Sequence, residues 1–354
     1  MLKGKKSIAV FVIVIALLLT GCNSFHQESP EETSQPDTSN EQDQEEQQDD
    51  NNEDINEEEE MLTLPKKDLQ KGDKGEPVRI LQEILIELGY EIDLTEIYNQ
   101  ETVWAITDLQ VQQEDFDVTG IYEEQTREIL ELVITGDLQI TPGSALAFQE
   151  STTIDEETVE LGNPYEILAL INKKHALPAD YEPEDLVVPD VRFPFPEDLP
   201  KKQMRKIAAK ALEQMFAAAD QKGLDLFAQS GFRSYERQEG LFASYVSAHG
   251  EEEANTFSAR PGESEHQSGL AMDVTSPDAD YQLTTAFGET EEGIWLQENA
   301  ADFGFIIRYP LGKEEITEYQ YEPWHLRYVG VRAAKEIMEQ EITLEEYLGE
   351  LKKN

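Results

Sequence analysis

The chain contains the segment Ser258-Ala-Arg-Pro-Gly-Glu-Ser-Glu-His-Gln-Ser-Gly-Leu-Ala-Met-Asp-Val274, which places an imidazole seven residues before a carboxylate. These groups are His266 and Asp273, and Gly269 between them allows a sharp turn. Residues 270–274 are typical of a short strand, with Asp273 on one of its faces. The turn at Gly269 can bring His266 back over that face.

This pair provides two ligands of the kind that a metal ion needs. Zinc is bound by nitrogen and oxygen ligands, and a catalytic site has three protein ligands and an open position for water. The candidate third ligand is His325 in Tyr321-Glu-Pro-Trp-His325, where Glu322 is a candidate base. The spacing alone would also fit the alternative to a metal site, which is a solvated surface histidine that happens to lie near an aspartate.

Four blocks of sequence are more specific than the spacing. They are Ser230-Gly-Phe-Arg-Ser-Tyr-Glu-Arg-Gln238, Ser264-Glu-His-Gln-Ser-Gly-Leu-Ala-Met-Asp273, Gly304-Phe-Ile-Ile-Arg-Tyr-Pro310 and Glu322-Pro-Trp-His-Leu-Arg-Tyr-Val-Gly330. They resemble the VanY-type D-alanyl-D-alanine carboxypeptidases, zinc enzymes that trim the peptide stems of peptidoglycan. The resemblance covers about residues 163–351, with the blocks in the family's order.

The resemblance implies one Zn²⁺ held by His266, Asp273 and His325, with Glu322 as general base. Two neutral imidazoles and one carboxylate leave the ion a net positive charge, which lowers the pKa of a bound water to about 7. Pro323 disfavours a helix at Glu322, so a strand end with a bend is expected there. The spacing does not show that Glu322 points at the metal; that assignment comes from the resemblance.

The resemblance also implies four residues that contact the substrate. Arg233 is expected to stabilise the oxyanion formed when an amide is attacked. Gln238, Ser264 and Tyr309 are expected to contact the stem peptide and its terminal carboxylate. The structural alternatives are a salt bridge for Arg233, a helix-surface or turn-capping role for Gln238 and Ser264, and packing for Tyr309.

Residues 1–22 are typical of a lipoprotein signal peptide. Three lysines precede an apolar run over residues 8–19, which is shorter than the ~20 residues of a membrane-spanning helix. Leu19-Thr-Gly-Cys22 resembles a lipobox, so cleavage is expected to leave Cys22 as the lipid-bearing N-terminus. Cys22 is also the chain's only cysteine, which excludes an internal disulfide.

Residues 23–61 are low in complexity and dense in acidic side chains. They have almost no apolar residues to bury, so a disordered acidic tether is expected. The whole chain has a formal net charge of -47. This charge argues against nucleic acid as a partner, because phosphates are bound by lysine and arginine.

Residues 62–135 are expected to form a small helical domain. Apolar residues at helical spacing predict a helix over 78–88, and two more are expected over 102–112, capped by Asn99, and 124–133. The segments that precede the last two echo each other, as Thr95-Glu-Ile-Tyr-Asn-Gln-Glu-Thr102 and Thr119-Gly-Ile-Tyr-Glu-Glu-Gln-Thr126. The pattern from Leu69 to Tyr90 resembles the three-helix peptidoglycan-binding domain. A helical spacer without a ligand is the alternative.

Residues 136–162 are expected to be a linker, and residues 163–354 an α+β domain with a small, mainly antiparallel sheet and flanking helices. A short helical segment is expected over 165–172. Helices are also expected over 201–223, 294–303, 331–339 and 344–351, and another helix is expected to carry Gln238. Strands are expected over 224–229, 270–274, 305–309 and 326–329. A capping box of Thr343 and Glu346 is expected before the last helix.

These observations predict a zinc carboxypeptidase that removes the terminal D-alanine of peptidoglycan stem peptides. It is expected to face the cell wall, anchored to the outer face of the membrane through Cys22. An L,D-carboxypeptidase acting on tetrapeptide stems and a peptidoglycan endopeptidase remain open as alternatives. A non-enzymatic wall-binding lipoprotein is a further alternative, although it would have no need of the base Glu322.

Overall fold

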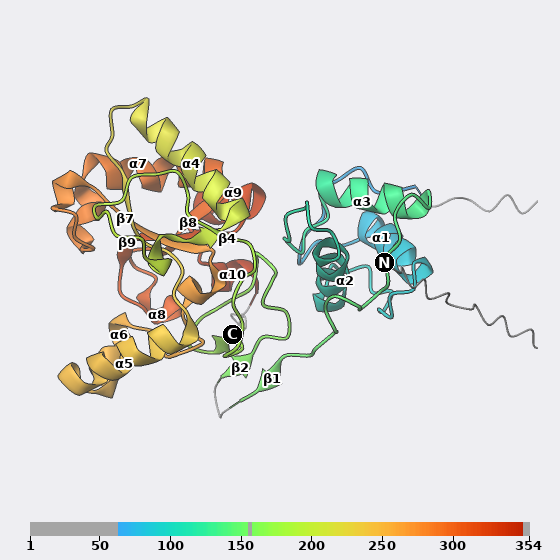
Figure 1. Ribbon diagram of the computed structural model, residues 1–354, viewed down its shortest axis with the longest axis horizontal. Helices are drawn as coiled ribbons and strands as arrows, with labels where there is room; N and C mark the ends of the chain where they lie inside the picture. Colours follow the sequence, from blue (N-terminus) through green and yellow to red (C-terminus); the bar gives the residue numbers. More distant parts are fainter. Residues whose placement is uncertain (1–62, 155–157, 350–354) are drawn as a thin grey trace, which may run out of the picture. The chain divides into compact units, whose positions relative to one another are not determined.

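The computed structural model describes residues 63–154 and 158–349 of the chain (Figure 1). The expected signal peptide with Cys22, the expected tether over residues 23–61 and the end of the last expected helix lie outside these residues. In the part that is described, no helix is both long and apolar enough to cross a membrane.

Three helices form the N-terminal part of the described chain, as expected. They are α1 (Glu76–Glu87), α2 (Gln100–Val111) and α3 (Glu124–Ile134). Asn99 caps α2 by accepting a hydrogen bond from the backbone N–H of Thr102. Residues from all three helices meet in one apolar core, which contains Leu81, Trp104 and Ile129.

The echo in the sequence has a structural cause in two buried glutamines. The side chain of Gln82 donates to Oγ1 of Thr95 and Thr102 and accepts from the backbone at Thr95. Gln110 makes the same contacts with Thr119 and Thr126. Each glutamine thereby satisfies the polar groups of the turn that leads into the next helix, which would be costly to bury unpaired.

Residues 136–187 contain short strands that the sequence did not predict. The strands β1 (Thr152–Thr153), β2 (Val159–Glu160) and β3 (His175–Ala176) form one small sheet. In a second sheet, β4 (Leu186–Val187) pairs with β5 (Met204–Arg205). Such short segments carry too few residues for a periodic pattern to be visible in the sequence.

A four-stranded antiparallel sheet is the centre of the C-terminal part, which confirms the expected α+β class. Its strand order is β6-β7-β9-β8. The strands are β6 (Phe227–Ser230), β7 (Ala271–Thr275), β8 (Phe305–Tyr309) and β9 (Glu322–Tyr328). The register pairs Asp273 with both Ser230 and His325, and it pairs Tyr309 with Glu322. The pairing therefore brings residues from four distant segments side by side.

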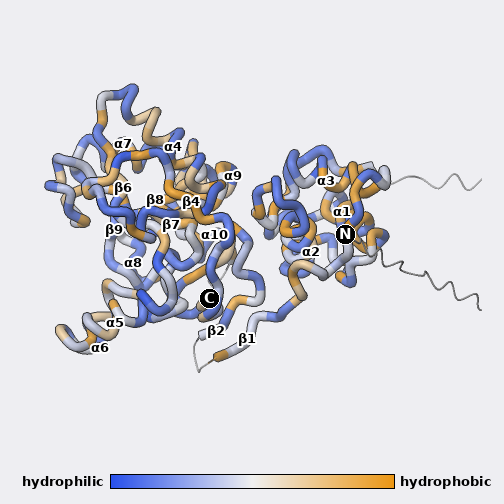
Figure 2. The backbone as a smooth tube through the Cα atoms, viewed as in Figure 1, coloured by the Kyte–Doolittle hydropathy of each residue, from blue (hydrophilic) through white to orange (hydrophobic). Residues whose placement is uncertain are grey.

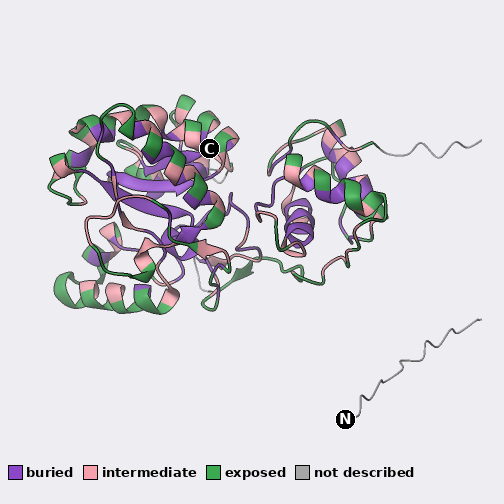
Figure 3. Cartoon of the chain, turned by 45° about the horizontal axis from the view of Figure 1, so that its top comes forward, coloured by how far each residue is buried: buried purple, intermediate pink, exposed green. Residues whose placement is uncertain are grey.

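The two faces of this sheet have different roles because side chains alternate along a strand. Met272 and Leu326 belong to the main hydrophobic core, which also contains residues of the helices α4 (Lys206–Asp220), α7 (Glu291–Asn299) and α9 (Val331–Glu339). The intervening residues Asp273 and His325 are also buried, but they belong to a polar cluster. Figure 3 shows the buried strands surrounded by helices whose outer faces are exposed.

Helix α4 is amphipathic, and its hydropathy alternates along the tube in Figure 2. The other helices of this part are α5 (Tyr235–His249), α6 (Glu251–Phe257), α8 (Glu314–Thr317) and α10 (Leu344–Tyr347). The predicted capping box of Thr343 and Glu346 is present at α10. Helix α5 carries Gln238, as expected, whereas α6 was not predicted.

Two helix predictions need correction. Residues 165–172 do not form a helix, because their carbonyl groups bind buried arginines: Tyr165 accepts from Arg205, and Ile167 and Ala169 accept from Arg327. Helix α4 begins five residues later than predicted, at Lys206, because residues 204–205 pair with β4 as strand β5. In both places a tertiary partner replaces the local hydrogen bond of a helix.

Candidate metal and catalytic site

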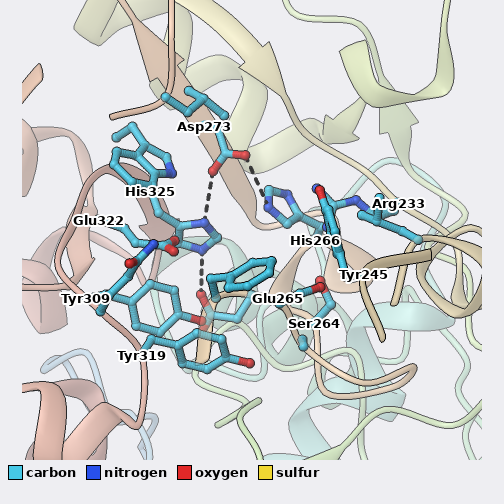
Figure 4. Close-up of a pocket in the computed structure, with 17 residues that line it drawn as sticks. Arg233, Tyr245, Ser264, Glu265, His266, Asp273, Tyr309, Tyr319, Glu322 and His325 are labelled. Carbon is cyan, nitrogen blue, oxygen red and sulfur yellow. Dashed lines mark hydrogen bonds and ion pairs between the residues drawn. The ribbon is translucent and has the colours of Figure 1, made fainter. Parts of the chain in front are cut away.

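The structure brings the three predicted metal ligands together. His266 lies in a short 3₁₀ turn (Glu265–Ser268) that ends at Gly269, whose φ of 69° is the left-handed conformation that glycine permits. Asp273 and His325 lie opposite each other on β7 and β9. One candidate ligand atom from each of the three side chains lies within 4.8 Å of the others. Figure 4 shows the cluster.

Hydrogen bonds to the far side of each imidazole orient the two histidines. Nδ1 of His266 lies 2.8 Å from the backbone oxygen of Gly231, and Nε2 of His325 lies 3.2 Å from Oε2 of Glu265. Both oxygens are acceptors, so in a neutral ring each of these nitrogens carries the proton. The lone pairs of His266 Nε2 and His325 Nδ1 then face Asp273, whose oxygens lie 3.4 and 3.0 Å away, respectively.

These separations fit a tetrahedral zinc site. Zinc–ligand bonds of about 2.0–2.1 Å at tetrahedral angles put neighbouring ligand atoms about 3.3 Å apart. The donor set of two nitrogens and one carboxylate is a catalytic type rather than a closed structural one. The residues present therefore fit the ion that the sequence predicts.

The charges in the site keep one of the two ligand histidines, His325, protonated until a metal ion binds. Burial lowers the pKa of His266 to about 3. Burial also acts to lower the pKa of His325, but hydrogen bonds to Asp273 and Glu265 outweigh it and raise this pKa to about 9. The metal-free His325 is therefore protonated near neutral pH, and binding of a metal ion displaces that proton.

Glu322 lies in the same cavity as the three ligands. This cavity has a volume of about 320 Å³, and its lining also includes Arg233, Ser264 and Tyr309. Burial raises the pKa of Glu322 to about 7, although the nearby His325 acts in the opposite direction. A carboxylate with a pKa near the working pH can both accept and return a proton, as a general base and acid must.

Arg233 is the only arginine or lysine that lines this cavity in the described chain. Its guanidinium donates to Oε1 of Gln238 at 2.8 Å and lies 3.4 Å from Oγ of Ser230. No carboxylate forms a salt bridge with it among the described residues, so the structural alternative of a salt bridge does not apply. Its charge remains available to an anionic group of a ligand.

The other three predicted substrate residues are placed differently from one another. Ser264 and Tyr309 line the cavity, and the ring of Tyr309 lies 5.0 Å from that of His325. Gln238 is buried and lines neither this cavity nor the larger one of about 720 Å³ that shares Arg233 with it. Besides accepting from Arg233, Gln238 donates to the backbone oxygen of Ala259 at 2.6 Å. The contacts of all three with a stem peptide stay predictions.

Glu265 is a site residue that the sequence reasoning missed. Its side chain is 0% exposed and accepts hydrogen bonds from Arg308 and Arg327, each at 2.7 Å, and one from His325. Arg308 and Arg327 thus form ion pairs with a carboxylate beside the metal site, which the sequence did not reveal. A carboxylate behind a ligand imidazole fixes its orientation and raises its basicity. The only signal in the sequence was adjacency to His266.

Tyr319 is a second missed residue. It lines the catalytic cavity and its ring lies 4.5 Å from that of Tyr309. Its hydroxyl is buried and has no hydrogen-bond partner within the described structure. A buried hydroxyl without a partner is costly, and a ligand in the cavity would supply one. In the sequence, Tyr319 stands in a loop with no motif of its own.

Replacing Glu265 by glutamine is expected to weaken metal binding about 10- to 100-fold, the usual cost of losing an outer-shell partner. The amide keeps the shape of the side chain but removes the charge that faces His325. Zinc affinity, measured by competition with a chelating dye at a temperature where the variant is folded, tests this result.

Glu298→Gln, at an exposed position on α7, is the matched control and should bind zinc as the unsubstituted chain does. The orienting role of Glu265 is refuted if its glutamine variant also keeps full zinc affinity. A lower melting temperature alone does not decide the matter, because the same change leaves two buried arginines short of one partner.

Comparison with known protein families agrees with the family resemblance expected for each of the two parts of the chain. Residues 201–331 match the family described as VanY, D-alanyl-D-alanine carboxypeptidase. Residues 74–130 match the family described as a putative peptidoglycan binding domain. The first match contains all of the metal-ligand candidates and Glu322, and the second contains the three helices of the N-terminal part up to Leu130.

Individual relatives extend this agreement. A putative carboxypeptidase, YodJ of Bacillus subtilis, is 55% identical over 197 residues, which are 56% of this chain and 71% of that protein. A D-alanyl-D-alanine carboxypeptidase of Enterococcus faecium is 31% identical over 277 residues, 76% of each chain. Among solved structures, the LdcB LD-carboxypeptidase is 53% identical with a TM-score of 0.55, covering 58% of this chain and 95% of that one. The chain therefore belongs to the VanY family of D-alanyl-D-alanine carboxypeptidases.

Proposed function

We propose that the chain is a zinc-dependent carboxypeptidase that removes the terminal D-alanine from peptidoglycan stem peptides. The observation that carries this proposal is one cavity that combines the metal-ligand set of His266, Asp273 and His325 with the buried carboxylate of Glu322. Membership of the VanY family supports the substrate class.

His266, Asp273 and His325 would hold the zinc ion, which when bound supplies Lewis-acid chemistry and makes water more acidic. Glu322 takes a proton from the attacking water and passes it to the departing amine. Its raised pKa suits both steps, because the group is neither a very weak base nor a very weak acid at neutral pH.

Arg233 stabilises the negative charge that develops on the attacked carbonyl oxygen. Partial burial strengthens the effect of its charge, because less water competes for the guanidinium, and Gln238 holds it in place. Ser264, Tyr309 and the unpartnered hydroxyl of Tyr319 provide hydrogen-bonding groups for the backbone or terminal carboxylate of the stem peptide.

Two bonds are candidates for hydrolysis. The sequence favoured the D,D bond of a pentapeptide stem, and the enterococcal relative is named for that activity. The L,D bond of a tetrapeptide stem is the second candidate, because the LD-carboxypeptidase LdcB is the more similar protein at 53% identity. Both reactions release a single D-alanine and use the same catalytic groups.

The remaining proposals concern where the enzyme works. The match of residues 74–130 to a peptidoglycan-binding family supports a wall-binding role for the helical part. A wall substrate requires the catalytic part to lie outside the cytoplasm. The lipobox-like Leu19-Thr-Gly-Cys22 supports attachment to the outer face of the membrane through a lipid on Cys22.

Incubation of the full-length chain with defined muropeptides, followed by mass spectrometry, tests the function. The expected result is loss of one alanine, and its complete suppression by a zinc chelator with recovery on addition of zinc. Release from pentapeptide identifies D,D activity, and release from tetrapeptide identifies L,D activity. Cleavage within the stem would identify an endopeptidase instead, and no cleavage of any muropeptide would refute the proposal.

A further inference from the structure

A second cavity adjoins the catalytic one. Its volume is about 720 Å³, and it shares Arg233 and Leu241 with the catalytic cavity. Its lining contains three cationic side chains, Lys201, Arg233 and Arg237, and one carboxylate, Glu182. We call this cavity the cationic groove. In Figure 4, Arg233 lies beside His266 at the edge of the metal site, on the side away from Glu322.

The two arginines of the cationic groove differ from the others in the chain. Every other arginine forms a salt bridge with a carboxylate. Within the described residues, Arg233 and Arg237 form none. Lys201 likewise has no salt bridge there, and its ammonium lies 3.8 Å from the ring centre of Phe195. Three cationic groups face a single lining carboxylate, Glu182, so the protein itself neutralises the charge of this groove only in part.

A groove with a net positive lining is unexpected in this chain. Acidic residues number 75 against 28 lysines and arginines, so carboxylates are abundant on its surface. A net charge of -47 repels anionic ligands at long range, and only a local cluster of cations can reverse the sign of the potential at one place. That place is continuous with the catalytic cavity through Arg233.

Helix α5 adds to the positive potential. It spans 15 residues, and its N-cap Ser234 lines the cationic groove. The unpaired N–H groups at the start of a helix carry a partial positive charge, which favours a bound anion. Ser234 caps one of these groups, the N–H of Arg237, and the acidic Glu236 in the first turn of α5 offsets part of the helix's positive charge.

We propose that the cationic groove is a second substrate subsite, which binds a side carboxylate of the stem peptide outside the hydrolysed bond. Such carboxylates occur on the γ-linked glutamate and on diaminopimelate, and both can be replaced by amides. The shared Arg233 makes the substrate, rather than an unrelated anion, the ligand that reaches the groove from the catalytic cavity. This inference rests on the proposed function and adds a preference for acidic over amidated stems.

The test compares two synthetic stem peptides that differ only in whether their side carboxylates are free or amidated. The full-length chain is expected to prefer the acidic stem in kcat/KM. In Lys201→Ala/Arg237→Ala this preference falls about tenfold, mainly through KM, since two charge contacts are lost. The preference of the unsubstituted chain is also expected to shrink as salt is added. Lys206→Ala/Lys222→Ala, at exposed positions that line no described cavity, should keep the preference.

Equal kcat/KM for both stems in the unsubstituted chain, or an unchanged preference in the double variant, overturns the proposal. Calorimetric binding of the same stems to Glu322→Gln separates this outcome from failure of the proposed function. If no stem is hydrolysed, but the acidic stem binds more tightly and Lys201→Ala/Arg237→Ala removes that difference, the subsite stands and the hydrolytic function falls.

Discussion

Glu322→Gln is expected to abolish hydrolysis while leaving the metal site intact. Glutamine has the shape of glutamate but cannot take a proton, and loss of a general base typically costs about 10²–10⁴-fold in rate. Glu322 is not one of the three clustered ligand candidates, so bound zinc should stay at one ion per chain. Stem-peptide hydrolysis measured beside zinc content by atomic absorption checks both halves of this result.

The pH profile provides a second reading of the same variant. A base must be deprotonated, so kcat/KM of the unsubstituted chain should rise as pH increases through the pKa of Glu322. That pKa is about 7 without metal, and the positive charge of zinc lowers it further, so the rise is expected at or below pH 7. The residual rate of Glu322→Gln should lack this rise. A fully active variant would exclude Glu322 as the base.

Glu315→Gln on α8 is the control for Glu322→Gln, because it makes the same change at an exposed position. It should retain both zinc and turnover. Equal losses in the two variants would mean that the effect of Glu322→Gln reflects the loss of a negative charge in this region rather than the loss of a base.

His266→Ala is expected to lose the metal and the activity together. Removing one of three ligands leaves only His325 and Asp273 to hold the ion. Loss of an outer-shell partner lowers metal affinity by up to about 100-fold, and loss of a ligand should lower the zinc affinity by more than this. The rise in melting temperature that zinc gives to the unsubstituted chain should also disappear, because a ligand stabilises only the protein that binds it. Zinc content and calorimetry with and without added zinc measure these effects.

His249→Ala is the matched control, since His249 is an exposed histidine at the end of α5. It should bind zinc and hydrolyse substrate as the unsubstituted chain does. Undiminished zinc content in His266→Ala would remove His266 from the ligand set and would leave the proposed site without its third ligand.

The metal ligands could be predicted because their chemistry is visible in short segments. His266 and Asp273 lie close together in the sequence, on either side of a glycine turn. The segment that contains them also matches a sequence motif of a known family. The third ligand lies far downstream: the residues made His325 a candidate, and the family resemblance implied that it joins the other two. The sheet register then confirms the meeting of Asp273 and His325, which no local pattern in the sequence could specify.

Residues whose roles depend on distant partners were not predictable in the same way. Glu265 looks like an ordinary polar residue of a turn, and its importance appears only when Arg308, Arg327 and His325 converge on it. The same cause lies behind the helix that was wrongly predicted near residues 165–172, where carbonyl groups bind Arg205 and Arg327. Local periodicity cannot report hydrogen bonds to side chains that are far away in the sequence.

The interactions of Glu265 also have a consequence for the end of the domain. Arg308 binds Glu265 and, through its other nitrogens, Glu345 on α10. Two ion pairs and one hydrogen bond thus connect the C-terminal turn to the imidazole of His325 in the metal cluster. Proteolytic trimming that removes Glu345 would leave a buried guanidinium half neutralised next to the carboxylate that orients His325. The C-terminal boundary of the catalytic unit is therefore set by electrostatic balance at the active centre as well as by packing.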